Sequence, residues 1–113
     1  MTEIRRVLAD YPEVKVEELN ANPPNFCDPD HEMVGILQRN ANLTSGVTPP
    51  PIISLGGTDA RLWRYAGVPA YVYGPSPSSM GRPDEFVTVD DLFHVLTVHA
   101  TSAWDYLRLS SDP

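Results

Sequence analysis

The fold of this chain depends most on one stretch, Ile52-Ile53-Ser54-Leu55-Gly56-Gly57-Thr58-Asp59-Ala60-Arg61, which joins an apolar run to a diglycine and a helix start. The apolar run predicts a buried strand, and Thr58 is a suitable cap for the helix that follows. Without side chains at Gly56 and Gly57, an anion can approach backbone N–H groups that the first helical turn leaves unpaired. Arg61 would add a planar, two-pronged donor. The stretch therefore predicts a carboxylate-binding turn, and the alternative is an ordinary strand-to-helix turn with Arg61 in solvent.

A second apolar run, Val68-Pro69-Ala70-Tyr71-Val72-Tyr73, follows the helix predicted over residues 59–65. Two strands joined through a helix favour a parallel pair with a right-handed crossover. The last helix of the chain has an apolar stripe at intervals of three and four, which we interpret as core packing, and Thr88 with Asp91 forms an approximate capping box. The predicted fold class is therefore α/β, a small sheet with a strand–helix–strand unit covered by helices. The stripe comprises Val89, Leu92, Phe93, Leu96, Ala100, Ala103 and Leu107.

The first half of the chain predicts two further helices and one strand. A helix is expected over residues 2–10, stopped by Tyr11-Pro12, and a half-exposed strand over residues 14–19. Residues 20–30 are rich in Asn, Pro and Asp, which is typical of a linker and makes them the best candidate for a domain boundary. A helix is expected from Asp30 to about Asn42, with its apolar residues at helical spacing: Met33, Ile36, Leu37 and Ala41.

Composition narrows the class of protein. With 113 residues and 42% hydrophobic content, the chain fits one small soluble domain, and no apolar run approaches the roughly 20 residues of a membrane span. The net charge of −7, with Lys15 as the one lysine, argues against a nucleic-acid surface. Cys27 is the single cysteine and cannot form an internal disulfide. Because no signal peptide is recognisable, we expect a cytoplasmic protein.

The order of motifs resembles the C-terminal end of the zinc-dependent aminoacylase and carboxypeptidase family, which includes acetylornithine deacetylase and succinyl-diaminopimelate desuccinylase. The resemblance implies that residues 1–20 correspond to the end of the family's lid, or dimerisation, domain. Residues 21–30 would be a linker, and residues 31–113 the C-terminal part of a catalytic-domain-like α/β unit. We therefore expect the chain to be the tail of a larger enzyme. The motifs that carry the match are Gly-Gly-Thr-Asp-Ala-Arg at 56–61, Gly-Val-Pro-Ala at 67–70, Tyr-Gly-Pro at 73–75 and Pro-Asp-Glu-Phe-Val at 83–87.

The resemblance also implies a function, as part of a metal-dependent amidohydrolase or peptidase that cleaves an N-acyl or peptide bond beside a free carboxylate. In this chain, the residues expected to hold the substrate carboxylate are Gly56, Gly57, Thr58 and Arg61. No catalytic residue and no metal ligand is expected here, because the family's remaining zinc ligands, bridging aspartate and general-base glutamate lie in its N-terminal portion. The open alternative is a stand-alone, non-catalytic domain that binds a carboxylate ligand or a protein.

One departure from the family concerns zinc, the cofactor of its full-length members. The final ligand histidine of the family would fall at Ser78 or Gly81, and neither residue can replace a neutral imidazole. His94 and His99 are five residues apart on a helix, so they point in different directions and do not predict a shared zinc site. We therefore expect no zinc in this chain alone, and no hydrolysis by it.

The predicted partners follow from the same reasoning. Besides a small carboxylate-bearing substrate, we expect either a homo-oligomer or association with the N-terminal portion of the family's fold. The reason is that, without such a partner, the open strand edges and the apolar faces around Trp63, Tyr71 and Tyr73 would be exposed to solvent. No nucleic-acid or membrane partner is expected.

Overall fold

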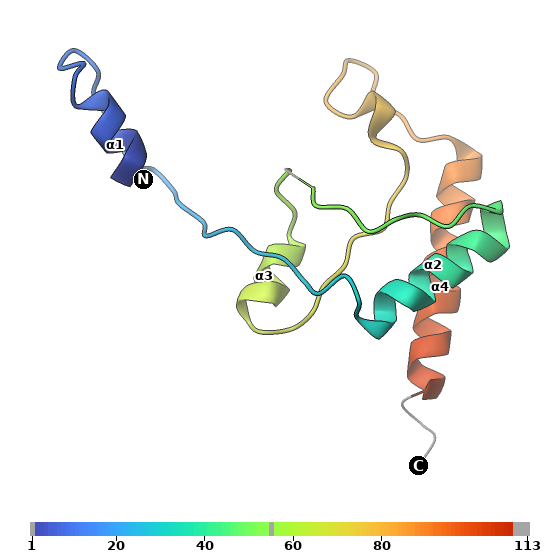
Figure 1. The fold of residues 1–113 in the computed structure, drawn as a ribbon. Coiled ribbons are helices and arrows are strands. Elements are labelled where there is room, and N and C mark those ends of the chain that lie inside the picture. The colour runs from blue at the N-terminus through green and yellow to red at the C-terminus, as the bar shows by residue number, and fades with distance from the viewer. Residues whose placement is uncertain (1, 55, 110–113) are drawn as a thin grey trace.

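The computed structural model describes residues 2–54 and 56–109, in which four α-helices are connected by extended segments (Figure 1). The predicted helices are all present, with ends that differ from the predictions by a few residues. None of the helices in the described part of the chain combines the length and apolar character that a membrane span requires. The elements are α1 (Thr2–Leu8), α2 (Glu32–Ser45), α3 (Ala60–Tyr65), the 3-10 turn η1 (Pro77–Ser79) and α4 (Val89–Leu109).

Local signals account for where the two long helices begin and end. At the start of α2, the His31 ring accepts a hydrogen bond at Nδ1 from the Met33 amide at 3.1 Å. At its end, Gly46 adopts the left-handed conformation with φ 74°, and its N–H bonds the Asn42 carbonyl. The Thr88 hydroxyl accepts from the Asp91 amide at 3.1 Å, so the predicted threonine cap of α4 is confirmed.

The core is a small contact between α2 and α4, which cross at one side of the molecule (Figure 1). Among the residues that the structure describes, four apolar side chains are buried: Val34, Ile36 and Ala41 from α2, and Val98 from α4. Met33 and Leu37, which the sequence placed on the same stripe, are half-buried at the edge of this contact. The predicted apolar face of α2 is therefore confirmed in its central part.

A polar cluster lies beside these apolar residues and fixes how the two helices meet. Buried Asn40 donates from Nδ2 to the Ser102 hydroxyl at 3.3 Å and to Asp105 Oδ2 at 3.0 Å. Arg39 forms an ion pair with the same carboxylate at 3.1 Å. The hydrogen bond from Asn40, followed by that from Arg39, lowers the pKa of Asp105 from its ordinary value. Because one buried amide reaches two α4 residues, it favours a single register between the helices.

The apolar stripe predicted to pack α4 into the core does not do so. Leu92, Phe93 and Leu96 are 54%, 61% and 59% exposed, whereas Val98 is fully buried. At about 100° per residue, the stripe and Val98 lie on opposite faces of the helix. The prediction is therefore wrong: α2 packs on the face that carries Val98 and Ser102, and the stripe faces outward.

The predicted α/β class is also wrong, because the described residues contain no strand or sheet. Residues 50–54 and 68–74 are extended but unpaired, and Ile52 and Ile53 are each 83% exposed. Leu55 of the predicted first strand lies outside the described residues. In the second segment, the Ala70 carbonyl accepts from Arg64, and the Tyr73 carbonyl is 2.8 Å from His99 Nε2. These side chains occupy the backbone groups that a ladder would need, and a two-stranded pair alone would be marginally stable.

The predicted strand over residues 14–19 is likewise extended without a ladder, and α1 has no buried residue. Two exposed ion pairs lie in the described part of this region, Arg6–Glu3 at 2.6 Å and Arg5–Glu18 at 3.2 Å. Such pairs contribute about 0–1 kcal/mol each. The N-terminal arm therefore stands apart from the α2–α4 core (Figure 1).

The overall shape is open. The radius of gyration is 19.2 Å and the molecule extends over 60 × 42 × 20 Å. A compact chain of this length would have a radius of gyration of about 13 Å. The chain thus leaves much apolar surface uncovered, as the exposed residues of α4 already indicate.

Candidate functional site

The diglycine turn lies between the extended segment 50–54 and α3. Gly57 has no positive φ, and a Cβ built on it would meet no atom within 4 Å. The backbone conformation at Gly57 therefore does not require glycine. The absence of side chains leaves the backbone open to approach from outside, which is what a carboxylate-binding turn needs.

Backbone amides of the turn are available to such a ligand. The Gly56 amide donates to the Ser54 hydroxyl at 3.2 Å, and the Ala60 amide makes a long 3.4 Å bond to the Thr58 hydroxyl. Within the described residues, the amides of Gly57, Thr58 and Asp59 donate to no acceptor. The predicted cap at Thr58 is therefore wrong by one residue: Asp59 occupies the N-cap position of α3, and its side chain accepts no bond from the amides of the first turn.

Arg61 is half-buried against the same turn. Its Nη1 donates to the Thr58 carbonyl at 3.2 Å and to Asp59 Oδ1 at 3.3 Å. Nε and Nη2 make no hydrogen bond within the described residues, so one edge of the guanidinium is open to a carboxylate. The Asp59 carboxylate is 91% exposed, and an ion pair of that kind is weak. The structure therefore gathers the four predicted residues at one turn and holds Arg61 by one nitrogen.

A second arginine of α3, which the sequence did not single out, organises the surroundings of this turn. Arg64 donates from Nε and Nη2 to the Ala70 carbonyl at 2.8 and 2.6 Å, and from Nη1 to Asn25 Oδ1 at 2.9 Å. The Ala70 amide in turn lies 3.3 Å from Cys27 Sγ. Arg64 thus ties α3 to residues 25–27 and to residue 70, and the predicted linker is held by side chains along this part. In the sequence, Arg64 lies three residues after Arg61 on the same helix. This spacing does not indicate which of the two arginines turns inward.

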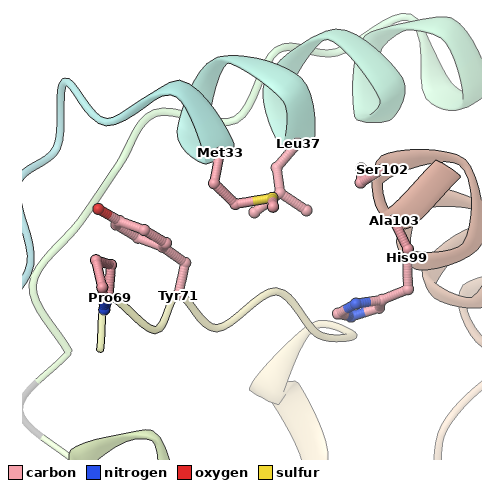
Figure 2. Close-up of a pocket in the computed structure, with 7 residues that line it drawn as sticks. All are labelled: Met33, Leu37, Pro69, Tyr71, His99, Ser102 and Ala103. Atoms are coloured by element: carbon pink, nitrogen blue, oxygen red, sulfur yellow. The ribbon is translucent and has the colours of Figure 1, made fainter. Parts of the chain in front are cut away.

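An open hollow of about 250 Å³ lies between α2, α4 and the extended segment 69–71 (Figure 2). Met33 and Leu37 point into it from α2, across from Tyr71, and His99 borders it from α4 (Figure 2). Its remaining lining residues are Pro69, Ser102 and Ala103. The Tyr71 hydroxyl donates to the Asp28 carbonyl at 2.8 Å, and burial, more than the nearby Cys27 and Asp28 charges, raises the pKa of Tyr71. The lining of the hollow is therefore about equally polar and apolar, with the His99 imidazole among its polar groups.

Both histidines of α4 contact Tyr73. The Tyr73 hydroxyl is 2.6 Å from His94 Nε2, and the Tyr73 carbonyl is 2.8 Å from His99 Nε2. Burial raises the pKa of the Tyr73 phenol, which therefore stays protonated and can donate to an unprotonated His94 Nε2. The two imidazoles accordingly anchor the extended segment to α4.

The loop before α4 is closed by its own hydrogen bonds. The buried Ser79 hydroxyl donates to the Phe86 carbonyl at 2.6 Å, and the Phe86 amide lies 3.2 Å from the same oxygen. The Gly81 amide donates to Glu85 Oε2 at 3.1 Å. Gly81 has φ 74°, a left-handed conformation in which a histidine side chain would be strained.

The residues of this chain therefore do not fit the zinc site of the resembling family. Within residues 2–54 and 56–109, no three His, Cys, Asp or Glu residues come together to hold a metal ion. Ser78, one of the two positions aligned with the ligand histidine, is exposed, and Gly81 has a left-handed φ that favours glycine. The metal content of this chain stays a prediction.

Comparison with known proteins identifies one family. The family model described as peptidase family M20/M25/M40 matches residues 4–105, which is most of the chain. Comparison with curated proteins found no match, and comparison with solved structures found none either. The match includes the diglycine turn and most, though not all, of the predicted lid-like segment and of α4.

Proposed function

Because the chain belongs to peptidase family M20/M25/M40, a family of hydrolases, we propose that it supplies the carboxylate-binding part of a metal-dependent amidohydrolase or peptidase. The proposed substrates are N-acyl amino acids, or peptides that present a free carboxylate beside the scissile bond. The finer relation to acetylornithine deacetylase and succinyl-diaminopimelate desuccinylase belongs to this proposal and rests on the motifs at residues 56–61 and 83–87.

The observation that carries the proposal is the free edge of Arg61. Both side-chain hydrogen bonds of this residue use Nη1, so Nε and Nη2 can together engage two carboxylate oxygens. The open amides of Gly57 and Thr58 lie in the same turn. A carboxylate held by this fork and these amides would be oriented by several charge-assisted bonds.

The proposed contribution of this chain is positioning. Holding the carboxylate at a turn that precedes α3 orients the adjacent amide bond, and orientation alone lowers the barrier of a bimolecular reaction substantially. Bond cleavage itself is assigned to no residue of this chain. Arg64 supports the site indirectly, since it anchors α3 to the neighbouring segments.

The test is a calorimetric titration of an N-acetyl amino acid into the wild-type chain and Arg61→Ala. Loss of the charged hydrogen bonds should weaken binding by about 1.5–3 kcal/mol. Arg82→Ala is the matched control, because Arg82 is exposed in the loop between η1 and α4. The amide of the same amino acid, which lacks the carboxylate, should bind wild type and Arg61→Ala equally. Equal affinity of wild type and Arg61→Ala for the acid would remove Arg61 from the site.

The alternative is a non-catalytic domain that binds a carboxylate ligand or a protein. Adding the metal-bearing N-terminal portion of a family member in trans distinguishes this alternative from the proposed function. Hydrolysis that depends on Arg61 would favour the interpretation of the chain as part of an enzyme. Binding of the N-acetyl amino acid without hydrolysis, whichever N-terminal portion is added, would favour a non-catalytic binding domain.

A further inference from the structure

The hollow between α2, α4 and residues 69–71 has the size of a small organic molecule. Its volume of about 250 Å³ lies just below the roughly 300–1,000 Å³ of typical ligand pockets, so an occupant would have about ten heavy atoms or fewer. None of the described residues that line it is Asp, Glu, Lys or Arg. A charged group placed there would lose part of its hydration without gaining an opposite charge, so the hollow favours a neutral occupant.

Two walls of the hollow can hold an aromatic ring. Met33 and Leu37 point into it from α2, and Tyr71 lies across from them (Figure 2). Tyr71 is held in place because its hydroxyl donates to the Asp28 carbonyl at 2.8 Å. A thioether and a phenol ring both make favourable contacts with an aromatic ring placed between them. The space between α2 and residues 69–71 therefore favours an aromatic group.

The third wall, formed by α4, offers one hydrogen-bond donor. Ser102 is 3% exposed, and its oxygen accepts from Asn40 Nδ2 at 3.3 Å. Because the same Nδ2 also donates to Asp105, the orientation of the Asn40 amide is fixed and the Ser102 oxygen must be the acceptor. In the part of the chain that the structure describes, the Ser102 O–H reaches no acceptor. A buried donor is therefore left at the edge of the hollow.

The same wall offers one acceptor, three residues earlier in the helix. His99 Nε2 lies 2.8 Å from the Tyr73 carbonyl, which can only accept, so Nε2 carries the hydrogen of the neutral ring. Nδ1 is then an acceptor, and it bonds to no described residue. Positions three apart on a helix are neighbours, so one ligand can reach both Ser102 and His99.

We propose that the hollow binds a neutral primary carboxamide carried on a small aromatic ring. The oxygen and one N–H of such a group lie on the same edge, so the oxygen can accept from Ser102 while the N–H donates to His99 Nδ1. The ring then occupies the space between Met33 and Tyr71. This inference goes beyond the proposed function, because the hollow shares no residue with the carboxylate-binding turn.

The first test is a titration of benzamide into the full chain, followed by two-dimensional NMR. We expect saturable shifts in α2, α4 and residues 69–71, with a dissociation constant in the millimolar range that suits so small a ligand. Ala103→Phe should abolish these shifts, because its ring fills the hollow. Thr101→Phe is the matched control: it adds the same ring at an exposed position of α4 that does not line the hollow, and should change the constant by no more than about twofold.

The second test concerns the hydrogen bonds. Ser102→Ala should weaken benzamide binding by about threefold to tenfold, since one neutral hydrogen bond is lost. Asn40 keeps its bond to Asp105 in this variant, so its circular dichroism should match that of the wild type. N,N-dimethylbenzamide, which lacks the N–H, should bind more weakly by a similar factor.

Benzoate has the same ring but a negative charge, and it should shift the residues of the hollow only at concentrations at least about tenfold higher than benzamide. Benzamide shifts that do not saturate, shifts that persist in Ala103→Phe, or a dissociation constant that Ser102→Ala leaves unchanged would each overturn the proposal. Equal binding of benzamide and benzoate in the hollow would overturn it as well.

Discussion

Replacing Arg64 should loosen the attachment of α3 to the rest of the chain. The guanidinium spans three segments, with two bonds to the Ala70 carbonyl and one to Asn25 Oδ1. In Arg64→Met the apolar stem is kept and all three bonds are lost. Asn25 can turn to water, but the half-buried Ala70 carbonyl loses both of its arginine donors. The Cys27 thiol, 3.6 Å from the same oxygen, remains as a weak donor. The cost should therefore fall at the lower end of the roughly 1–3 kcal/mol of an unsatisfied buried group, and we expect a loss of about 1 kcal/mol.

Urea unfolding followed by the fluorescence of Trp63, the neighbouring residue on α3, measures this loss at the relevant place. Arg64→Lys should recover part of the stability, because one ammonium can reach the Ala70 carbonyl but cannot also span to Asn25. Arg82→Met is the control for removing a positive charge from an acidic chain. If Arg64→Met and Arg82→Met agree within about 0.5 kcal/mol, Arg64 does not hold these segments together.

Three further predictions concern pH, backbone strain and metal. The hydrogen bond from Asn40, followed by that from Arg39, lowers the pKa of Asp105. The contribution of Asp105 to stability should therefore be complete above its ordinary pKa and be lost as the pH falls through the lowered pKa. Asp105→Asn should abolish this pH dependence in acid titrations followed by circular dichroism. Gly81→Ala should lower stability by about 1 kcal/mol because of its φ of 74°, whereas Gly57→Ala should change the unfolding midpoint little. Elemental analysis after dialysis against a weak chelator should find no stoichiometric zinc. One zinc per chain would contradict the prediction that the residues of this chain alone form no zinc site.

The candidate site was predictable in its composition but not in its contacts. The diglycine, Thr58 and Arg61 are adjacent in sequence, so any fold of this segment places them together. Which arginine of α3 turns inward is decided by groups about 40 residues away, since Arg64 bonds Asn25. The role of Cys27 beside Ala70 has the same origin, because spacing along the chain carries no information on such distant pairs.

The sequence by itself determined the helices, since caps, glycine stops and apolar periodicity act within a few residues. Tertiary structure decided which apolar surfaces are covered. The outward stripe is the more apolar face of α4, yet α2 packs on the face that carries Val98, Ser102 and Asp105, because the buried Asn40 amide bonds to partners there. The sheet failed for the same physical reason: a strand requires hydrogen bonds from another segment, and here Arg64 and His99 side chains occupy the carbonyls of Ala70 and Tyr73 that a ladder would use.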